Sequence, residues 1–200
     1  MTEIALKSPD RTEQLSMPWR EDLFANTGKS GVKAAMVAWA TSPGFVTITW
    51  WRVAKWLRES GRPGRALSWI ILRRCLMNRG CYISLLAEIG PGLNLPHPTG
   101  IVVGDGVRIG RSSTIYQNVT LGRHSASRPG YPVLGDGTTV YAGAVIIGAI
   151  AIGEGAVVAA NSVVNREVAP GAVAMGAPAR IVPQARPPAE LPDQANRKLP

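Results

Sequence analysis

The sequence predicts a parallel β-helix in its C-terminal half, preceded by a shorter helical segment. Three observations support this: an aliphatic residue at every sixth position, small residues between these positions, and helical spacing in the front part. The period of six is clearest in the series Leu134, Val140, Ile146, Ile152, Val158 and Val164. Helical faces recur at about 3.6 residues and strand faces at 2, so six fits neither element alone. A strict hexapeptide period is typical of a coil whose aliphatic residues point inward.

Small residues occupy the positions where such a coil would turn. In the segments 134–137 and 152–155, glycine follows the aliphatic residue and recurs two places later. Glycine adopts the left-handed conformation at little cost, so these segments fit corners of the coil. The fifth position of each hexapeptide is mostly small or branched, as a narrow interior requires: Thr138, Ala144, Ile150, Ala156, Ser162 and Val168.

The repeat extends upstream and is interrupted twice. Earlier aliphatic residues at this spacing are Ile89, Leu95 and Ile101, and then Val103, Ile109, Ile115 and Leu121. The phase slips by two residues between Ile101 and Val103. The stretch 122–132 lacks the period and is rich in loop-forming residues. Since a loop that leaves a solenoid is more often functional than structural, we expect it to contribute to a site.

Helical spacing marks the chain before the repeat. Over 44–57, one predicted face carries Trp50, Val53, Ala54 and Leu57, and the polar face carries Arg52, Lys55 and Glu59. After a break at 61–64, a second helix is expected over about 65–77. We expect the two helices to pack on the first coil and cover its open edge. A second interpretation adds contact between their Trp and Arg faces and a membrane surface.

These patterns divide the chain into four parts. We expect residues 1–30 to be poorly ordered, 31–80 to be helical, 81–182 to form the β-helix with its loop 122–132, and 183–200 to be a flexible tail. Two hundred residues suffice for one good core with a small appended unit.

Composition narrows the classes of function. A net charge of +9 favours an anionic ligand or lipid, but no nucleic-acid module accompanies it, so nucleic-acid binding is not expected. The two cysteines, Cys75 and Cys81, supply no disulfide framework, and residues 1–34 contain no apolar signal core. The longest apolar runs, 34–40 and 67–72, are too short to span a bilayer. We therefore expect a cytoplasmic protein, with peripheral attachment to the inner membrane face as a further option.

The chain has two histidines, and histidine is the side chain best matched to proton transfer near neutral pH. His97 lies at the phase slip between Pro96 and Pro98 and is the first candidate for a catalytic base. His124, in the aperiodic loop, is the second candidate. Two distant histidines and two cysteines in the front half do not make a zinc ligand set, so no metal is expected.

The span from about Ile83 to Val182 resembles the serine acetyltransferase group of hexapeptide-repeat acyltransferases. The motifs that carry the resemblance are His-Pro-Thr-Gly-Ile-Val-Val-Gly at 97–104, Gln-Asn-Val-Thr-Leu-Gly at 117–122, and Gly-Ala-Pro-Ala-Arg-Ile-Val at 176–182. The sequence Trp-Arg-Val-Ala at 51–54 is also similar to shorter relatives that acetylate exopolysaccharide and capsule sugars.

The resemblance implies a left-handed β-helix, a homotrimer, and acetyl-CoA bound in a groove shared between neighbouring subunits. His97 would be the general base that deprotonates an acceptor hydroxyl as it attacks the thioester. Gly122, Ala142 and Ala160 would let the pantetheine arm lie close to the coil. Arg180 would contact a CoA phosphate, because a guanidinium matches phosphate geometry, or would close the last coil as a structural residue.

Three departures from the family pattern concern the acceptor. The family usually places Asp directly before the catalytic histidine and another Asp before the first coil, where this chain has Pro96 and Tyr82. It usually ends the loop with Arg-His-Pro, where residues 130–132 are Gly-Tyr-Pro. A zwitterionic acceptor needs such charges once it leaves water, so serine is not the expected acceptor. Glu88 and Asp105 are candidates for orienting the histidine, and Asp105 fits a turn equally well.

The expected acceptor is instead the hydroxyl of a glycan, either a small molecule or lipid-linked, or of a related molecule. Tyr131 would stack on a sugar ring, and Gln117 and Asn118 are the other expected contacts. The predicted function is therefore an acetyl-CoA-dependent O-acetyltransferase of polysaccharide biosynthesis. The alternatives are a serine O-acetyltransferase of cysteine biosynthesis and a non-catalytic solenoid that binds a partner.

Overall fold

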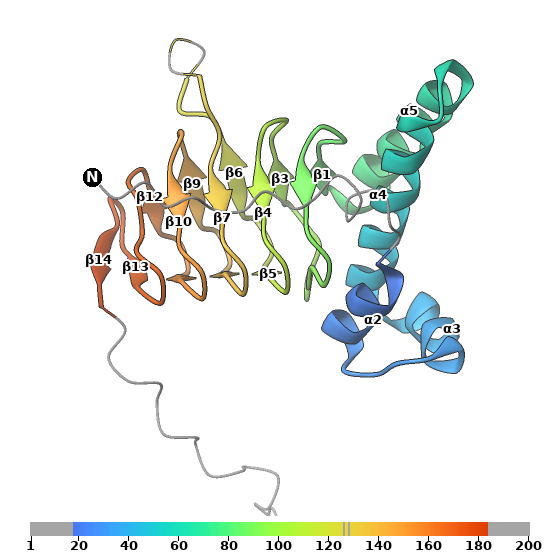
Figure 1. The fold of residues 1–200 in the computed structure, drawn as a ribbon, viewed down its shortest axis with the longest axis horizontal. Helices are drawn as coiled ribbons and strands as arrows, with labels where there is room; N and C mark the ends of the chain where they lie inside the picture. Colours follow the sequence, from blue (N-terminus) through green and yellow to red (C-terminus); the bar gives the residue numbers. More distant parts are fainter. Residues whose placement is uncertain (1–17, 126, 128, 184–200) are drawn as a thin grey trace, which may run out of the picture.

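The structure, a computed structural model, describes residues 18–125, 127 and 129–183, without the side chains of residues 75–79. The terminal parts 1–17 and 184–200, about which the sequence makes predictions, lie outside the described residues. Helices α2 (Trp19–Thr27), α3 (Val32–Thr41), α4 (Pro43–Glu59) and α5 (Arg62–Arg79) precede a stack of short strands (Figure 1). The strands are β1 (Tyr82–Ile83), β2 (Glu88–Ile89), β3 (Val102–Val103), β4 (Arg108–Ile109), β5 (Thr114–Ile115), β6 (Thr120–Gly122), β7 (Val133–Leu134), β8 (Thr139–Val140), β9 (Val145–Ile147), β10 (Ala151–Ile152), β11 (Val157–Val158), β12 (Val163–Val164), β13 (Val173–Met175) and β14 (Arg180–Val182).

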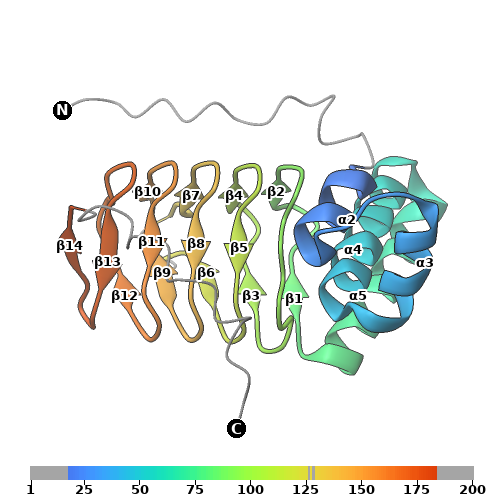
Figure 2. The same ribbon diagram turned by 90° about the horizontal axis from the view of Figure 1, so that it is seen from below.

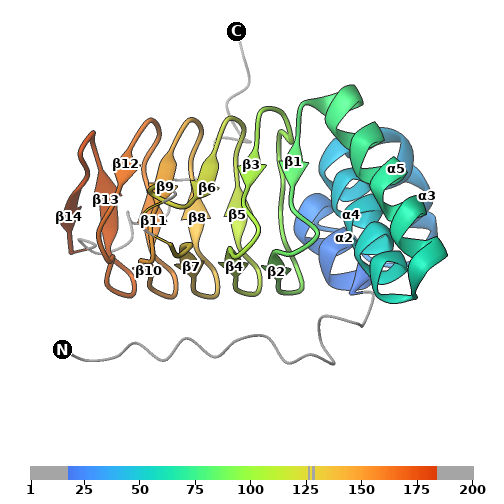
Figure 3. The same ribbon diagram turned by 90° about the horizontal axis from the view of Figure 1, so that it is seen from above.

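The strands form three sheets that wall a long prism (Figures 2 and 3). Sheet A has the order β1-β3-β6-β9-β12, sheet B the order β10-β7-β4-β2, and sheet C the order β14-β13-β11-β8-β5. Neighbouring strands pair in parallel, except that β13 and β14 pair antiparallel. The register pairs Val163 with Val145, so one coil takes three hexapeptides. The predicted left-handed β-helix with N-terminal helices is confirmed.

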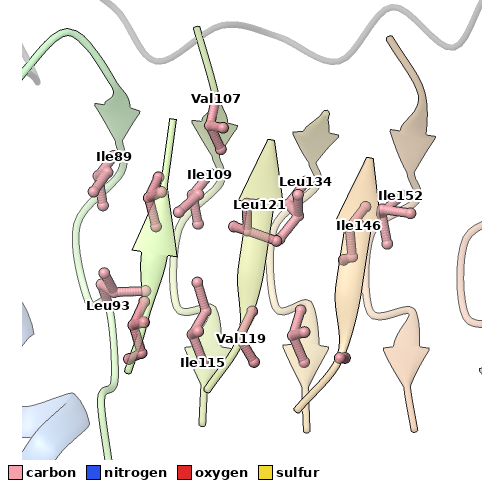
Figure 4. Close-up of a cluster of buried hydrophobic side chains, with 14 of the residues drawn as sticks. Ile89, Leu93, Val107, Ile109, Ile115, Val119, Leu121, Leu134, Ile146 and Ile152 are labelled. Atoms are coloured by element: carbon pink, nitrogen blue, oxygen red, sulfur yellow. The ribbon is translucent and has the colours of Figure 1, made fainter. Parts of the chain in front are cut away.

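The aliphatic residues of the repeat fill the interior of the prism. Figure 4 shows side chains from successive coils, including Ile109, Leu121, Ile146 and Ile152, gathered between the sheets, and all four are fully buried. Burying such a side chain contributes roughly 1.5–3 kcal/mol. The small fifth positions lie inside as well, and the Thr138 hydroxyl donates a 2.7 Å hydrogen bond to the Gly135 carbonyl, three residues earlier in the same turn. The period of six therefore specifies the core directly.

Helix α4 covers the open end of the first coil with cationic side chains. The polar face predicted for this helix is wrong at Arg52 and Lys55, which are only 7% and 8% exposed. Arg52 donates hydrogen bonds to the carbonyls of Ile89 and Gly90, and Lys55 donates to those of Leu85 and Ala87. These carbonyls have no further coil beyond them, so buried cations satisfy oxygens that would otherwise lack partners.

The first thirty residues are not uniformly disordered as predicted, because Trp19–Thr27 is helix α2. Leu23 on this helix is fully buried and packs in a small core with Ala38 and Phe45. Helix α3 was not recognised as a separate element within the predicted helical segment. The later helices extend beyond the expected bounds, since Pro43 begins α4 and α5 begins in the predicted break at 61–64.

Among the described residues, no helix combines the length and apolar character needed to cross a membrane.

Candidate active site

The turns that lead from sheet C to sheet A line up along one edge of the prism. This C–A edge comprises residues 96–101, 116–119, 141–144 and 159–162 of successive coils. The phase slip in the sequence lies in its first turn, where two extra residues widen the corner. His97 is exposed in this turn, next to the buried Pro98, and its carbonyl accepts a 2.7 Å hydrogen bond from the Thr99 amide. The slip therefore presents an imidazole on the outer surface of the coil.

The C–A edge also holds four of the other predicted site residues. Gln117, Asn118, Ala142 and Ala160 lie in its later turns. Backbone hydrogen bonds connect the turns in order: Asn118 N to Thr99 O at 2.9 Å, Gly143 N to Gln117 O at 3.0 Å, and Asn161 N to Ala142 O at 2.9 Å. The side chains of Ala142 and Ala160 on this edge are short, so an extended ligand could lie close to the backbone of these two turns.

Gln117 carries a buried polar atom without a partner. Within the part of the chain that the structure describes, its Oε1 atom is buried and accepts no hydrogen bond. An unsatisfied buried acceptor costs about 1–3 kcal/mol, so such atoms usually have a partner from a ligand, water or another subunit. Gln117 lies in the C–A turn of the coil that follows the one carrying His97.

Two tyrosines that the sequence reasoning missed belong to this edge. The rings of Tyr116 and Tyr141 stack with centroids 5.1 Å apart and an interplanar angle of 18°. They directly precede Gln117 and Ala142 in successive coils, and Tyr141 is exposed. The two tyrosines occupy equivalent positions in successive coils, and this equivalence was the available signal in the sequence. The loop 122–132 lies between them and breaks the regular spacing, so the equivalence is not visible from the sequence alone.

The remaining predicted site residues lie elsewhere on the chain. Gly122 ends β6 on sheet A, and Arg180 is exposed in β14 of the last coil. Tyr131, at the end of the loop between sheets A and B, is half-buried against the backbone at Gly104 and Gly106. A Cβ on Gly106 would lie 2.5 Å from the Tyr131 ring, so the coil covers one face of this ring. Within one chain these residues do not share the edge that holds the histidine.

The two carboxylates proposed to orient the histidine do not lie beside it. Asp105 occupies the turn from sheet A to sheet B, and its Oδ1 atom accepts a 2.6 Å hydrogen bond from the Ser84 hydroxyl. Glu88 lies on sheet B, where its charge acts on Lys55 of helix α4. Asp105 is therefore a turn residue, as its Gly-Asp-Gly context also allowed, and the orienting role proposed for both carboxylates is wrong for a single chain.

Helix α2 instead holds the backbone that leads to the histidine. The side-chain amide of Asn26 donates a 2.8 Å hydrogen bond to Leu93 O and accepts one of 3.1 Å from Leu95 N. One turn earlier in the same helix, Asp22 accepts a 3.0 Å hydrogen bond from Gly92 N. The i, i+4 spacing of the two polar residues was the available signal, because it places them on one helix face.

His124 is exposed in the loop, in the turn from sheet A to sheet B, whereas His97 is on the C–A edge. Among the described residues, no three His, Cys, Asp or Glu side chains gather where they could hold a metal ion.

Comparison with known proteins identifies relatives of this chain. A family model described as bacterial transferase hexapeptide (six repeats) matches residues 131–166. A serine acetyltransferase of Salmonella typhimurium is 38% identical over 108 residues, which cover 54% of this chain and 39% of the relative. A plasmid serine acetyltransferase of Synechococcus elongatus is 35% identical over 118 residues, with 54% and 36% covered. The chain thus spans about two fifths of the length of these curated relatives.

Solved structures match a larger part of the chain. Soybean serine acetyltransferase without ligand superposes with a TM-score of 0.75 at 36% identity, covering 84% of this chain and 69% of that one. The Neisseria gonorrhoeae serine acetyltransferase in complex with serine gives 0.74 at 32% identity, with 84% and 69% covered. A serine acetyltransferase in complex with CoA gives 0.68 at 32% identity, with 82% and 68% covered. The likeness therefore includes the helices as well as the coil.

Proposed function

Because this chain belongs to the hexapeptide-repeat acyltransferases, in their serine acetyltransferase-like group, we propose that it transfers an acetyl group from acetyl-CoA to a hydroxyl. In this reaction His97 takes the hydroxyl proton as the oxygen attacks the thioester carbonyl. The new C–O bond forms, the C–S bond breaks, and the proton passes to the CoA sulfur. Base catalysis of this kind contributes about 10²–10⁴-fold to the rate, and alignment of the two substrates contributes much of the rest.

The observation that carries the proposal is the C–A edge. It combines an exposed imidazole at the widened turn, the short side chains of Ala142 and Ala160 in the later turns, and a buried, unsatisfied acceptor on Gln117 in the turn between them. An extended thioester substrate fits this combination: its arm follows Ala142 and Ala160 while its carbonyl reaches His97. Binding of CoA by a solved relative supports the same donor.

The proposed assembly is a homotrimer in which each site lies between two coils. Gly122, Tyr131 and Arg180 lie away from the C–A edge of their own chain, so they reach an active site only across a subunit interface. In this arrangement Gly122 lies near the pantetheine arm, Arg180 contacts a CoA phosphate, and Tyr131 with Gln117 and Asn118 contacts the acceptor. Sedimentation-velocity analysis tests this assembly. A homotrimer predicts a sedimenting species with the mass of three chains.

Two acceptors remain candidates. The relatives are serine acetyltransferases, and one was solved with serine, so the comparisons favour L-serine over the glycan expected from the sequence. A glycan hydroxyl stays as the second candidate because Pro96 and Tyr82 stand where the family pattern has acids. Without these acids, the buried amino group of serine lacks charge partners on this chain.

A thiol-release assay decides between the acceptors. The purified chain is incubated with acetyl-CoA and either L-serine or a panel of neutral glycosides, and CoA is measured with a thiol reagent. Turnover with serine alone identifies a serine acetyltransferase, and turnover with glycosides alone identifies the second candidate. Failure to release CoA with any acceptor would overturn the enzymatic proposal and favour the non-catalytic solenoid.

The front helices support a peripheral contact with an anionic membrane. Trp56, Trp69 and Ile70 are exposed on α4 and α5, and Trp69 is 62% exposed. Exposed cations lie beside them on α5, including Arg73 and Arg74. Aromatic and basic side chains together favour the surface of anionic bilayers. Co-sedimentation with phosphatidylglycerol vesicles, but not with phosphatidylcholine vesicles, is the expected result, and equal recovery with both would contradict it.

A further inference from the structure

A large cleft opens beside the turn that carries His97. Its volume is about 770 Å³, and it lies between helices α2 and α3, the start of α4, and Pro96 of the first C–A turn. Pro96 directly precedes the exposed His97, so the cleft reaches the turn that carries the candidate base, although His97 itself is not part of its lining. Its volume falls within the range of small-molecule sites and far exceeds the space that a single amino acid needs.

Two lysines supply the charge of this cleft. Lys29 and Lys33 are the charged residues among its described lining, and both side chains are exposed. Two of the lining hydroxyls donate to local partners: Thr27 donates to Leu23 O, and Thr41 donates to Val37 O. The lysine ammonium groups therefore dominate recognition of any ligand there. A lysine ammonium is a compact point charge with three donors, which suits a phosphate group.

Besides the lysines, the cleft has an apolar part. Ala34, Val37 and Ala38 of α3, the helix that also carries Lys33, and Pro43 of α4 line it. A ligand that combines a phosphate with a larger, less polar body matches this division, whereas a free amino acid would leave most of the cleft empty.

We propose that this cleft binds a phosphate group of the acceptor, and that the acceptor is therefore the second candidate above, a glycan hydroxyl, in the form of a phosphate-bearing sugar whose hydroxyl reaches His97 past Pro96. The inference rests on the proposed acetyl transfer. CoA also carries phosphates, but Arg180, the residue proposed to contact them, lies in β14 at the other end of the prism from α2 and α3 (Figure 1). The lysine pair therefore faces the acceptor side of the site.

Calorimetric titration tests the proposal on the full chain saturated with CoA, so that the CoA phosphate sites are occupied. The probes are inorganic pyrophosphate, glucose 1-phosphate and the neutral methyl glucoside. We expect both phosphate probes to bind at least about tenfold more tightly than the glucoside, as charge-assisted contacts allow. The Lys29→Gln/Lys33→Gln double variant is expected to lose this preference. The control Arg166→Gln, an exposed cation in the turn after β12, is expected to keep it.

Three results would overturn the proposal: no binding of either phosphate probe to the CoA-saturated chain, equal binding by the double variant, or a double variant whose main defect is weaker CoA binding. The last result would assign the lysines to the CoA phosphates. A thermal melt of each variant excludes loss of folding as the cause. Failure of the proposed acetyl transfer is distinguishable, because CoA release would then be absent while phosphate binding to the lysines persists.

Discussion

The side-chain amide of Asn26 in helix α2 is hydrogen-bonded to the backbone amide of Leu95, two residues before His97, at 3.1 Å. The same side chain donates to Leu93 O at 2.8 Å. Gly44 at the start of α4 packs against the same segment, because a Cβ there would collide with the Leu95 carbonyl. The helical cap therefore fixes the backbone that presents the candidate base, so the cap belongs to the site as well as to the fold.

Replacing Asn26 by Ala is expected to lower the free energy of unfolding by about 1–3 kcal/mol, because it leaves the Leu95 amide and the Leu93 carbonyl without partners. The expected kinetic effect is a lower kcat with little change in the KM for acetyl-CoA, because the proposed donor site lies in later coils. Urea unfolding and steady-state kinetics measure both quantities. Asn165→Ala, an exposed asparagine, is the control. Equal stability of the two variants would contradict the positioning role.

Breaking the ion pair between Asp22 and Arg52 is expected to cause a larger loss of folding stability. The Asp22 carboxylate is 1% exposed and accepts hydrogen bonds from Arg52 Nε at 2.6 Å and Nη2 at 3.1 Å. Asp22→Ala leaves a buried guanidinium without its counter-ion, which costs about 3–5 kcal/mol. Glu21→Ala on the exposed side of the same helix is expected to change stability by less than about 0.5 kcal/mol. Equal denaturant midpoints for Asp22→Ala and Glu21→Ala would refute this account of the cap.

The buried cation Lys55 predicts a dependence of stability on pH. Burial lowers the pKa of Lys55 below its usual value of 10.5, and the nearby Glu59 and Glu88 oppose that shift only in part. The unfolded chain then holds this proton more tightly than the folded chain. Folding stability should therefore rise as pH increases from the folded-state pKa towards 10.5.

The measurement for this prediction compares the unfolding free energies of the wild type and Lys55→Gln at several pH values between 8 and 10.5. The difference between them should shift in favour of the wild type as pH rises. Parallel pH curves for the two proteins would show that Lys55 titrates normally in the folded state.

Replacing each of two glycines in one turn by alanine should lower the folding stability by different amounts. Gly153 leaves space for the next coil, since a Cβ there would lie 2.6 Å from Pro170 Cα, and the backbone cannot move away cheaply. Gly155 has a φ of +63° but open space around it. Gly155→Ala should cost about 1–2 kcal/mol from conformational strain, and Gly153→Ala about 3 kcal/mol or more from crowding between coils. Thermal melts of both variants test the order, which would be wrong if Gly155→Ala proved the more damaging change.

The β-helix was predictable because each hexapeptide carries its buried aliphatic residue at the same position. The aliphatic position points inward whatever the neighbouring coil contains, so the sequence pattern alone defines the core. The buried cations were not predictable in this way, because Arg52 and Lys55 look like solvent-facing residues until the end of the coil presents its carbonyls to them. Helix α2 was missed for a similar reason: Asp22 and Asn26 are polar, and only tertiary contacts make their burial favourable.

The site was predictable in part. The phase slip placed His97 at a special turn, and the resemblance placed Gln117, Ala142 and Ala160 along the same edge. The partners of His97 were not predictable, because the carboxylates nearest to it in sequence lie on other turns of the coil. The stacked pair Tyr116 and Tyr141 was hidden because the inserted loop shifts the sequence spacing of equivalent positions.

The most direct test of the central claim is the rate of CoA release by the His97→Ala variant at saturating acetyl-CoA and acceptor. We expect a loss of about 10²–10⁴-fold, with an unchanged oligomeric state and melting temperature, because only the proton acceptor is removed. His124→Ala, which changes the chain's other histidine, is the matched control and should retain activity. A His97→Ala protein that releases CoA at the wild-type rate would contradict the assignment of this histidine as the base.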